Sequence, residues 1–136
     1  MGFDPVCLYV EDDPISREVM ELLLIQVLGF SQVFMLNDSI NFIQRVKALP
    51  MRPDIIFLDI HVRPYNGFDM LAMLRHEPDY AHIPTVALTA SVMNEEVQKL
   101  RSAGFNGAIA KPLDQDTFLD TISRILNGEQ VWRILR

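Results

Sequence analysis

Acidic, basic and hydroxyl side chains stand at the ends of several short apolar segments of this chain: Glu11, Asp12, Asp59, Thr89 and Lys111. Carboxylates brought together repel one another. A hard cation such as Mg²⁺ relieves this repulsion because it binds carboxylate oxygens while keeping several waters. A lysine adds a permanent positive charge. Such a set suits phosphoryl transfer onto a carboxylate, which depends on positioning and charge neutralisation. Asp59 is the expected nucleophile.

The sequence lacks the residues of two other common kinds of site. Neither glycine-rich phosphate loop, GxxxxGK[ST] or GxGxxG, occurs in it. No cysteine and no paired serine and histidine stand at the segment ends, so a hydrolytic triad is not expected.

Asp59 follows the apolar run 55–58 and precedes a loop rich in Pro, Asn and Gly. A run this short and rich in branched residues is typical of a strand that is covered on both faces. Ligands of open α/β sheets bind beyond the carboxyl ends of the strands, which makes Asp59 a site candidate. The alternative is a helix cap. It is disfavoured because the next helix begins only near Gly67.

Apolar runs and helical patterns alternate along the whole chain. The predicted strands cover 6–10, 33–35, 55–58, 83–88 and 108–110, and the predicted helices cover 14–28, 40–49, 67–76, 95–103 and 115–126. This alternation indicates a parallel sheet with helices on both faces. Asp13 is placed as the cap of the first helix. One face of that helix carries Ile15, Val19, Leu22, Leu23 and Val27.

The length of 136 residues fits a single domain, placed at 1–127 and followed by a short tail at 128–136. The tail is unusually apolar, with Val131, Trp132, Ile134 and Leu135. Two interpretations stay open: Trp132 folds back over the last helix, or the tail forms a partner or dimer surface.

Composition narrows the class of protein. The net charge of −6 and scattered Lys and Arg residues argue against direct nucleic-acid binding. The single cysteine, Cys7, excludes an intramolecular disulfide and fits a reducing compartment. No signal peptide and no apolar stretch of membrane-spanning length is found. These features predict a soluble cytoplasmic domain with no membrane contact.

Four segments together resemble the signatures of response regulator receiver domains. They are Val10-Glu11-Asp12-Asp13-Pro14, Pro53-Asp54-Ile55-Ile56-Phe57-Leu58-Asp59, Leu88-Thr89-Ala90 and Ala110-Lys111-Pro112. The resemblance covers residues 6–127, and the joint spacing is highly specific. It implies a flavodoxin-like (βα)5 doubly wound parallel sheet with strand order 2-1-3-4-5.

The resemblance also implies a phosphorelay function. Asp59 would accept a phosphoryl group from a sensor histidine kinase or a histidine phosphotransfer protein. Asp12, Asp59 and the backbone carbonyl of His61 would bind Mg²⁺, with Glu11 acting through water. Thr89 and Lys111 would contact the phosphoryl group, and Lys111-Pro112 would be a cis peptide. Output would pass by contact with a downstream protein, and a homodimer is allowed.

Three positions depart from the family pattern. Ala108 stands where an aromatic residue usually couples to the threonine, so output must use backbone shifts or another side chain. Pro64 lies one residue later than usual, which predicts an altered loop beside the metal. His61 is expected at the solvent-facing rim, where it would alter the access of water to a phosphorylated Asp59.

Two other functions remain as alternatives. A pseudo-receiver would keep the fold as an interaction module without phosphorylation, and Ala108 and the shifted Pro64 count slightly for it. An aspartyl-phosphate hydrolase of the haloacid-dehalogenase type would use similar residues. Those enzymes usually carry a second aspartate two residues after the nucleophile, where this chain has His61, and the chain is short for such an enzyme with a cap.

Overall fold

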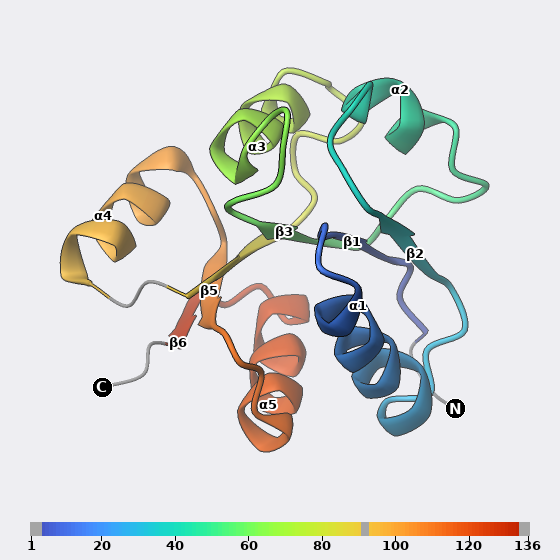
Figure 1. Ribbon diagram of the computed structural model, residues 1–136, viewed down its shortest axis with the longest axis vertical. Coiled ribbons are helices and arrows are strands. Elements are labelled where there is room, and N and C mark those ends of the chain that lie inside the picture. The colour runs from blue at the N-terminus through green and yellow to red at the C-terminus, as the bar shows by residue number, and fades with distance from the viewer. Residues whose placement is uncertain (1–3, 91–92, 134–136) are drawn as a thin grey trace.

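The computed structural model describes residues 4–90 and 93–133, which form a six-stranded parallel sheet covered by helices (Figure 1). The strand order is β2-β1-β3-β4-β5-β6. The strands are β1 (Cys7–Val10), β2 (Val33–Leu36), β3 (Ile55–Asp59), β4 (Thr85–Thr89), β5 (Gly107–Ala110) and β6 (Val131–Arg133). The helices are α1 (Pro14–Glu21), its π-helical continuation η1 (Leu22–Val27), α2 (Phe42–Lys47), α3 (Gly67–Arg75), α4 (Asn94–Ala103) and α5 (Gln115–Leu126). The predicted flavodoxin-like fold and the order of its first five strands are confirmed.

Two apolar cores lie on opposite faces of the sheet. Successive side chains of a strand point to opposite faces, so Leu8 and Val10 of β1 join the core under α2, α3 and α4. Cys7 and Tyr9 join the core under α1 and α5. Both faces of the central strands are therefore buried, which explains why their sequences read as continuous apolar runs. No helix in the described part of the chain has the length and apolarity needed to cross a membrane.

The first helix differs from the prediction in which face it buries. Its N-terminus is capped as expected, since the Asp13 carboxylate accepts a hydrogen bond of 3.1 Å from the Ser16 amide. Of the predicted face only Leu23 is buried, whereas Ile15, Val19, Leu22 and Val27 are exposed. The sheet instead receives the neighbouring stripe, which is Met20, Leu23 and Leu24. Both stripes have helical spacing, so spacing alone could not select the inward one.

Residues Val131–Arg133 of the predicted tail form β6, which is parallel to β5 and extends the sheet. Val131 is buried in the core under α5. Because side chains alternate along a strand, Trp132 lies on the opposite face and packs against the core under α3 and α4. The interpretation in which Trp132 folds back over the last helix is therefore wrong, and Val131 makes that contact instead.

Gly107 of β5 lies in close contact with β6. A substitution at this position therefore tests how strongly β6 packs on the sheet. A Cβ at this position would lie 2.5 Å from the Val131 carbonyl oxygen and 2.9 Å from Ile125 Cδ1. We expect Gly107→Ala to displace β6 and to lower the free energy of unfolding by roughly 1–3 kcal/mol, as overpacking does. Urea denaturation measures the change.

The control for this prediction is the same substitution in a chain that ends at Gly128. There the Val131 carbonyl is absent, so the penalty of Gly107→Ala should shrink markedly. An equal penalty with and without β6 would contradict the packing described for Gly107.

Candidate functional site

Three carboxylates meet at the carboxyl ends of β1 and β3. Val10 and Leu58 are paired neighbours in the sheet, so the residues that follow them come to lie side by side. One carboxylate oxygen from each of Glu11, Asp12 and Asp59 lies within 4.8 Å of the others. The sequence predicted this acidic cluster because parallel strands present their carboxyl ends at one edge.

Lys111 comes to the same place from β5. Its ammonium Nζ lies 2.8 Å from Glu11 Oε1 and 3.3 Å from Asp59 Oδ2. The backbone amide of Lys111 donates to the Thr89 carbonyl at 2.9 Å, which fixes the start of this loop beside β4. The Lys111–Pro112 peptide is cis, as predicted. Burial lowers the pKa of Lys111, but the two carboxylates outweigh burial and raise it, so the lysine stays charged.

Asp59 is the last residue of β3 and is only 5% exposed. Its Oδ1 accepts a hydrogen bond of 3.1 Å from the His61 amide. Burial and the adjacent Glu11 carboxylate raise the pKa of Asp59 to about 6, more than the His61 amide and Lys111 lower it. Asp59 is therefore a carboxylate whose negative charge is only partly compensated by the protein.

Glu11 is completely buried, and its pKa is shifted in the opposite direction from that of Asp59. The Tyr9 hydroxyl donates to Glu11 Oε1 at 2.6 Å, and the Asp13 amide donates to Oε2 at 3.3 Å. Burial raises the pKa of Glu11, but hydrogen bonds from the Asp59 carboxyl, Lys111 and Tyr9 outweigh it and lower the pKa. Glu11 therefore keeps a fixed negative charge beside Asp59.

The residue types fit a hard divalent cation. Two buried carboxylates and the exposed Asp12 offer oxygen ligands to one point, and the single lysine balances only part of their charge. Mg²⁺ prefers oxygen ligands and retains several waters, which Asp12 on the open side would allow. The raised pKa of Asp59 comes first from burial and then from the neighbouring Glu11 carboxylate, whose negative charge a bound cation would also offset.

The remaining predicted residues lie around this cluster. Thr89 is buried at the end of β4, and its neighbour Leu88 pairs with Asp59 across the sheet. His61 is exposed, in agreement with its predicted place at the rim. The loop that carries Pro64 has a cis Arg63–Pro64 peptide.

Two residues of the site were not identified from the sequence. Tyr9 was treated only as part of an apolar strand, although its spacing of two from Glu11 places both side chains on one face. Ser39 is buried before α2, and its hydroxyl donates to the Tyr65 carbonyl at 2.8 Å and accepts from the Tyr65 amide at 2.7 Å. It ties the loop after Asp59 to the segment after β2. No local sequence pattern predicts the contact between Ser39 and Tyr65, which are 26 positions apart.

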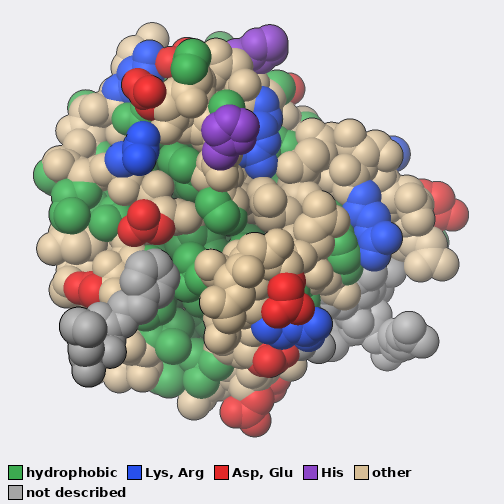
Figure 2. Space-filling view, turned by 180° about the vertical axis from the view of Figure 1, so that it is seen from behind, with side chains coloured by type: hydrophobic (Ala, Val, Ile, Leu, Met, Phe, Trp, Pro, Cys, Tyr) green, Lys and Arg blue, Asp and Glu red, His purple; other side chains and the backbone are tan. Residues whose placement is uncertain are grey.

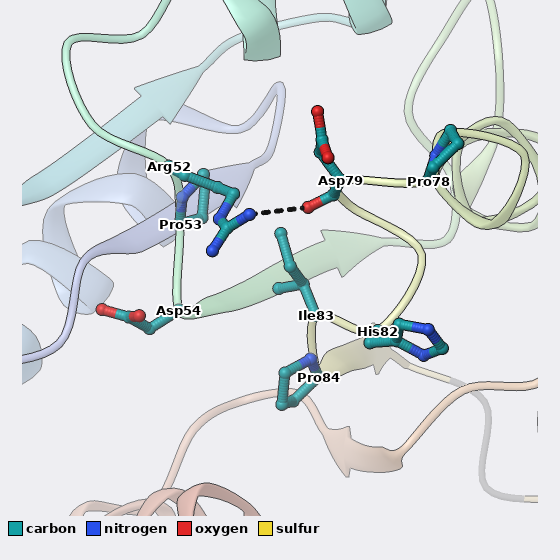
Figure 3. Close-up of a pocket in the computed structure, with 8 residues that line it drawn as sticks. All are labelled: Arg52, Pro53, Asp54, Pro78, Asp79, His82, Ile83 and Pro84. Atoms are coloured by element: carbon teal, nitrogen blue, oxygen red, sulfur yellow. Dashed lines mark hydrogen bonds between the residues drawn. The ribbon is translucent and has the colours of Figure 1, made fainter.

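A second hollow lies at the opposite, amino ends of β3 and β4 (Figure 3). The guanidinium of Arg52 donates to the Asp79 backbone carbonyl at 3.2 Å. The carboxylates of Asp54 and Asp79 point in different directions, and Asp54 accepts a hydrogen bond from the Val6 amide at 2.7 Å. The acidic groups do not converge, so this hollow does not repeat the chemistry of the cleft.

Comparison with known proteins identifies the family. The family model of the response regulator receiver domain matches residues 7–123. The chain belongs to the response regulator receiver domain family. Among curated relatives, a nitrate/nitrite response regulator protein homolog of Haemophilus influenzae is 30% identical over 132 residues, which is 91% of this chain and 58% of that protein. The polar-differentiation response regulator DivK of Brucella anthropi is 32% identical over 75 residues, 55% of this chain and 61% of that protein.

Solved structures of receivers share the fold. The chemotaxis response regulator CheY4 of Vibrio cholerae superposes with a TM-score of 0.80 at 24% identity, over 90% of this chain and 99% of that one. The receiver domain of the sensor histidine kinase PA1611 of Pseudomonas aeruginosa, solved with a magnesium ion in its active-site cleft, has a TM-score of 0.78 at 24% identity, over 92% and 99%. The matches to the two curated relatives span about three fifths of the length of those proteins. Receivers are signalling domains of two-component systems.

The charge of Asp59 should limit the stability of the metal-free protein. The folded pKa of about 6 lies above the ordinary aspartate value of about 3.9. The folded state therefore binds a proton more tightly, and this stabilisation is lost as the pH rises through about 6. In a chelator, we expect Asp59→Asn to raise the free energy of unfolding at pH 8 by roughly 2–3 kcal/mol, from the size of that shift. Thermal unfolding of both proteins from pH 4 to 8 measures it. A gain that does not shrink towards pH 4 would contradict this origin.

The hydrogen bond from the Tyr9 hydroxyl to the buried Glu11 carboxylate should stabilise the folded protein. Tyr9→Phe keeps the ring in the core and removes the donor to a buried carboxylate. We expect a loss of roughly 1–2 kcal/mol in the free energy of unfolding. Tyr65→Phe is the matched control because Tyr65 is exposed, and it should change stability by less than about 0.5 kcal/mol. Equal effects of the two substitutions would show that the Tyr9–Glu11 hydrogen bond has no special weight.

Proposed function

We propose that this receiver is phosphorylated on Asp59 by the phosphohistidine of a sensor histidine kinase or a histidine phosphotransfer protein. The observation that supports this most directly is the position of the Asp59 carboxylate between the Lys111 ammonium and the acidic pair. Phosphorylation would change the affinity of this chain for a downstream partner in the cytoplasm. That partner is either a different protein or a second copy of this chain. Such a signal is a population shift, since contacts with the phosphoryl group favour one conformation over another.

The proposed roles follow the geometry of the cleft. An Asp59 carboxylate oxygen attacks phosphorus, forming a P–O bond while the P–N bond to the donor imidazole breaks and the imidazole takes a proton from solvent. Asp12, Asp59 and the His61 carbonyl would hold Mg²⁺, with Glu11 acting through water. The ion would supply charge neutralisation at the phosphoryl oxygens. Lys111 and Thr89 would contact those oxygens from the β5 and β4 sides.

An exposed apolar stripe on α1 and the first residue of η1 lies beside this cleft and suits the docking of the phosphodonor. Ile15, Val19 and Leu22 follow helical spacing and are 69%, 38% and 54% exposed. A mostly apolar hollow of about 200 Å³ separates the start of the stripe from Pro112 and Leu113 in the loop after Lys111. A histidine phosphotransfer helix seated here would reach Asp59. By contrast, Figure 2 shows single charges of both signs and no continuous basic surface on the face that it presents, which gives no support to nucleic-acid binding on that face.

Phosphorylation can be tested with acetyl phosphate and Mg²⁺. We expect intact-mass spectrometry to detect one added phosphoryl group, which is lost in Asp59→Asn and with a chelator. Lys111→Ala should lower the labelling rate roughly 10²-fold, the usual effect of removing one charge-stabilising donor. A folded protein that takes no label would contradict the proposal and favour the pseudo-receiver, whereas turnover of a phosphate monoester would favour the hydrolase.

The docking surface needs a protein donor. With a phosphorylated histidine phosphotransfer domain as donor, we expect Ile15→Asp to slow transfer at least about tenfold, as loss of an interface anchor does. Ile40→Asp is the matched control, since Ile40 is 52% exposed before α2, outside α1. Labelling by acetyl phosphate should stay unchanged in both variants. Equal transfer to Ile15→Asp and Ile40→Asp would exclude α1 as the docking surface.

A further inference from the structure

The small residue Ala108 has a large neighbour that the sequence did not reveal. In the register of the sheet, Ala108 pairs with Ala87 on one side and with Trp132 of β6 on the other. Ala87 and Ala108 belong to the core under α2, α3 and α4, and Trp132 packs against it. Ala87 and Ala108 are neighbours across two strands, and their small side chains leave room above the sheet. The partly buried indole of Trp132, on the edge strand β6, packs against this core.

Trp132 also contacts helix α4 directly. The guanidinium carbon of Arg101 lies 4.9 Å from the centroid of the Trp132 ring, which is cation–π geometry. β6 is therefore attached on two sides. Val131 is held under α5, while Trp132 holds α4 on the other face.

Thr89 lies on the same face of the sheet as Ala87 and its neighbour Ala108. β4 ends at Thr89 in the cleft, and α4 begins at Asn94. Thr89 is two residues beyond Ala87 on the same strand, so both side chains face the α3 and α4 side of the sheet. Ala87 begins the row that continues through Ala108 to Trp132, so a movement of Thr89 toward a group on Asp59 would reach that row.

We propose that Trp132 is a positioning residue that couples the Asp59 cleft to the surface of α4 and β6. The coupling runs from Thr89 along the row of Ala87 and Ala108 to the indole, which takes the place of a large side chain at Ala108 and contacts Arg101 of α4. The inference rests on the proposed phosphorylation of Asp59 and names the surface through which it is read. A purely structural role is the alternative, in which β6 only covers the edge of β5. Val131 would suffice for that role.

The fluorescence of Trp132 provides a specific test, because the chain contains a single tryptophan. The protein is titrated with beryllofluoride and Mg²⁺, a stable mimic of the bound phosphoryl group, and labelled with acetyl phosphate in parallel. We expect a shift in emission and in acrylamide quenching that follows the occupied fraction. Asp59→Asn should abolish the shift.

Coupling is reciprocal, so changes at Trp132 should alter binding at Asp59. We expect Trp132→Ala and Arg101→Ala to change the affinity for beryllofluoride about fivefold or more, the lower end of typical coupling. Trp132→Phe should restore most of it. Arg101 is exposed, so its substitution keeps the protein folded, and Lys99→Ala on the same helix is the matched control with no effect expected.

The outcomes separate the two proposals. A phosphoryl group detected by mass, with unchanged Trp132 fluorescence and unchanged affinity in Arg101→Ala, would overturn the coupling alone and leave β6 as an edge cover. A folded protein that takes neither label nor beryllofluoride would overturn the proposed function, and the coupling with it.

Discussion

The structure depends on the balance between two buried carboxylates and one lysine. Glu11 and Asp59 are placed at the edge of an apolar sheet, where burial disfavours their charged forms. The Lys111 ammonium contacts both, and the Tyr9 hydroxyl contacts Glu11. These contacts hold Glu11 ionised but leave Asp59 with a raised pKa. The residual negative charge is what makes this cleft suited to a cation and, with it, to an incoming phosphoryl group.

The fold supplies this balance by joining distant segments. Lys111 is 100 residues from Glu11 and 52 from Asp59 in the sequence. Parallel pairing of β1 with β3, β3 with β4 and β4 with β5 brings them to one edge. The loops beyond that edge are fixed by hydrogen bonds, from Ser39 to Tyr65 and from Lys111 to Thr89. The apolar strands thus act as a rigid support, and the chemistry is confined to the residues where they end.

The sixth strand adds an aromatic side chain beside β5. β6 continues the sheet on the far side of β5, with Val131 under α5 and Trp132 towards α4. Gly107 and Ala108 are small where β6 and its indole approach, so the two strands are matched in shape. A sequence position that lacks an aromatic residue is therefore accompanied by one from a neighbouring strand. This places an aromatic side chain, in contact with Arg101, next to Ala108.

The sequence pattern alone determined a parallel sheet of five strands and the gathering of Glu11, Asp12, Asp59, Thr89 and Lys111 at its carboxyl edge. The order of those strands came from the resemblance to receiver domains, and the sixth strand was not predicted. Short apolar runs in strict alternation with helical patterns allow few other folds, and parallel strands must present their ends together. Only the tertiary structure decided which apolar stripe of α1 faces the sheet, that Tyr9 and Ser39 support the site, and that Trp132 lies beside Ala108. The spacing of apolar residues shows that a helix has an apolar stripe, but it does not decide which of two stripes faces the sheet. Which surface covers a given stripe depends on segments far away in the chain, and their contacts exist only once the chain is folded.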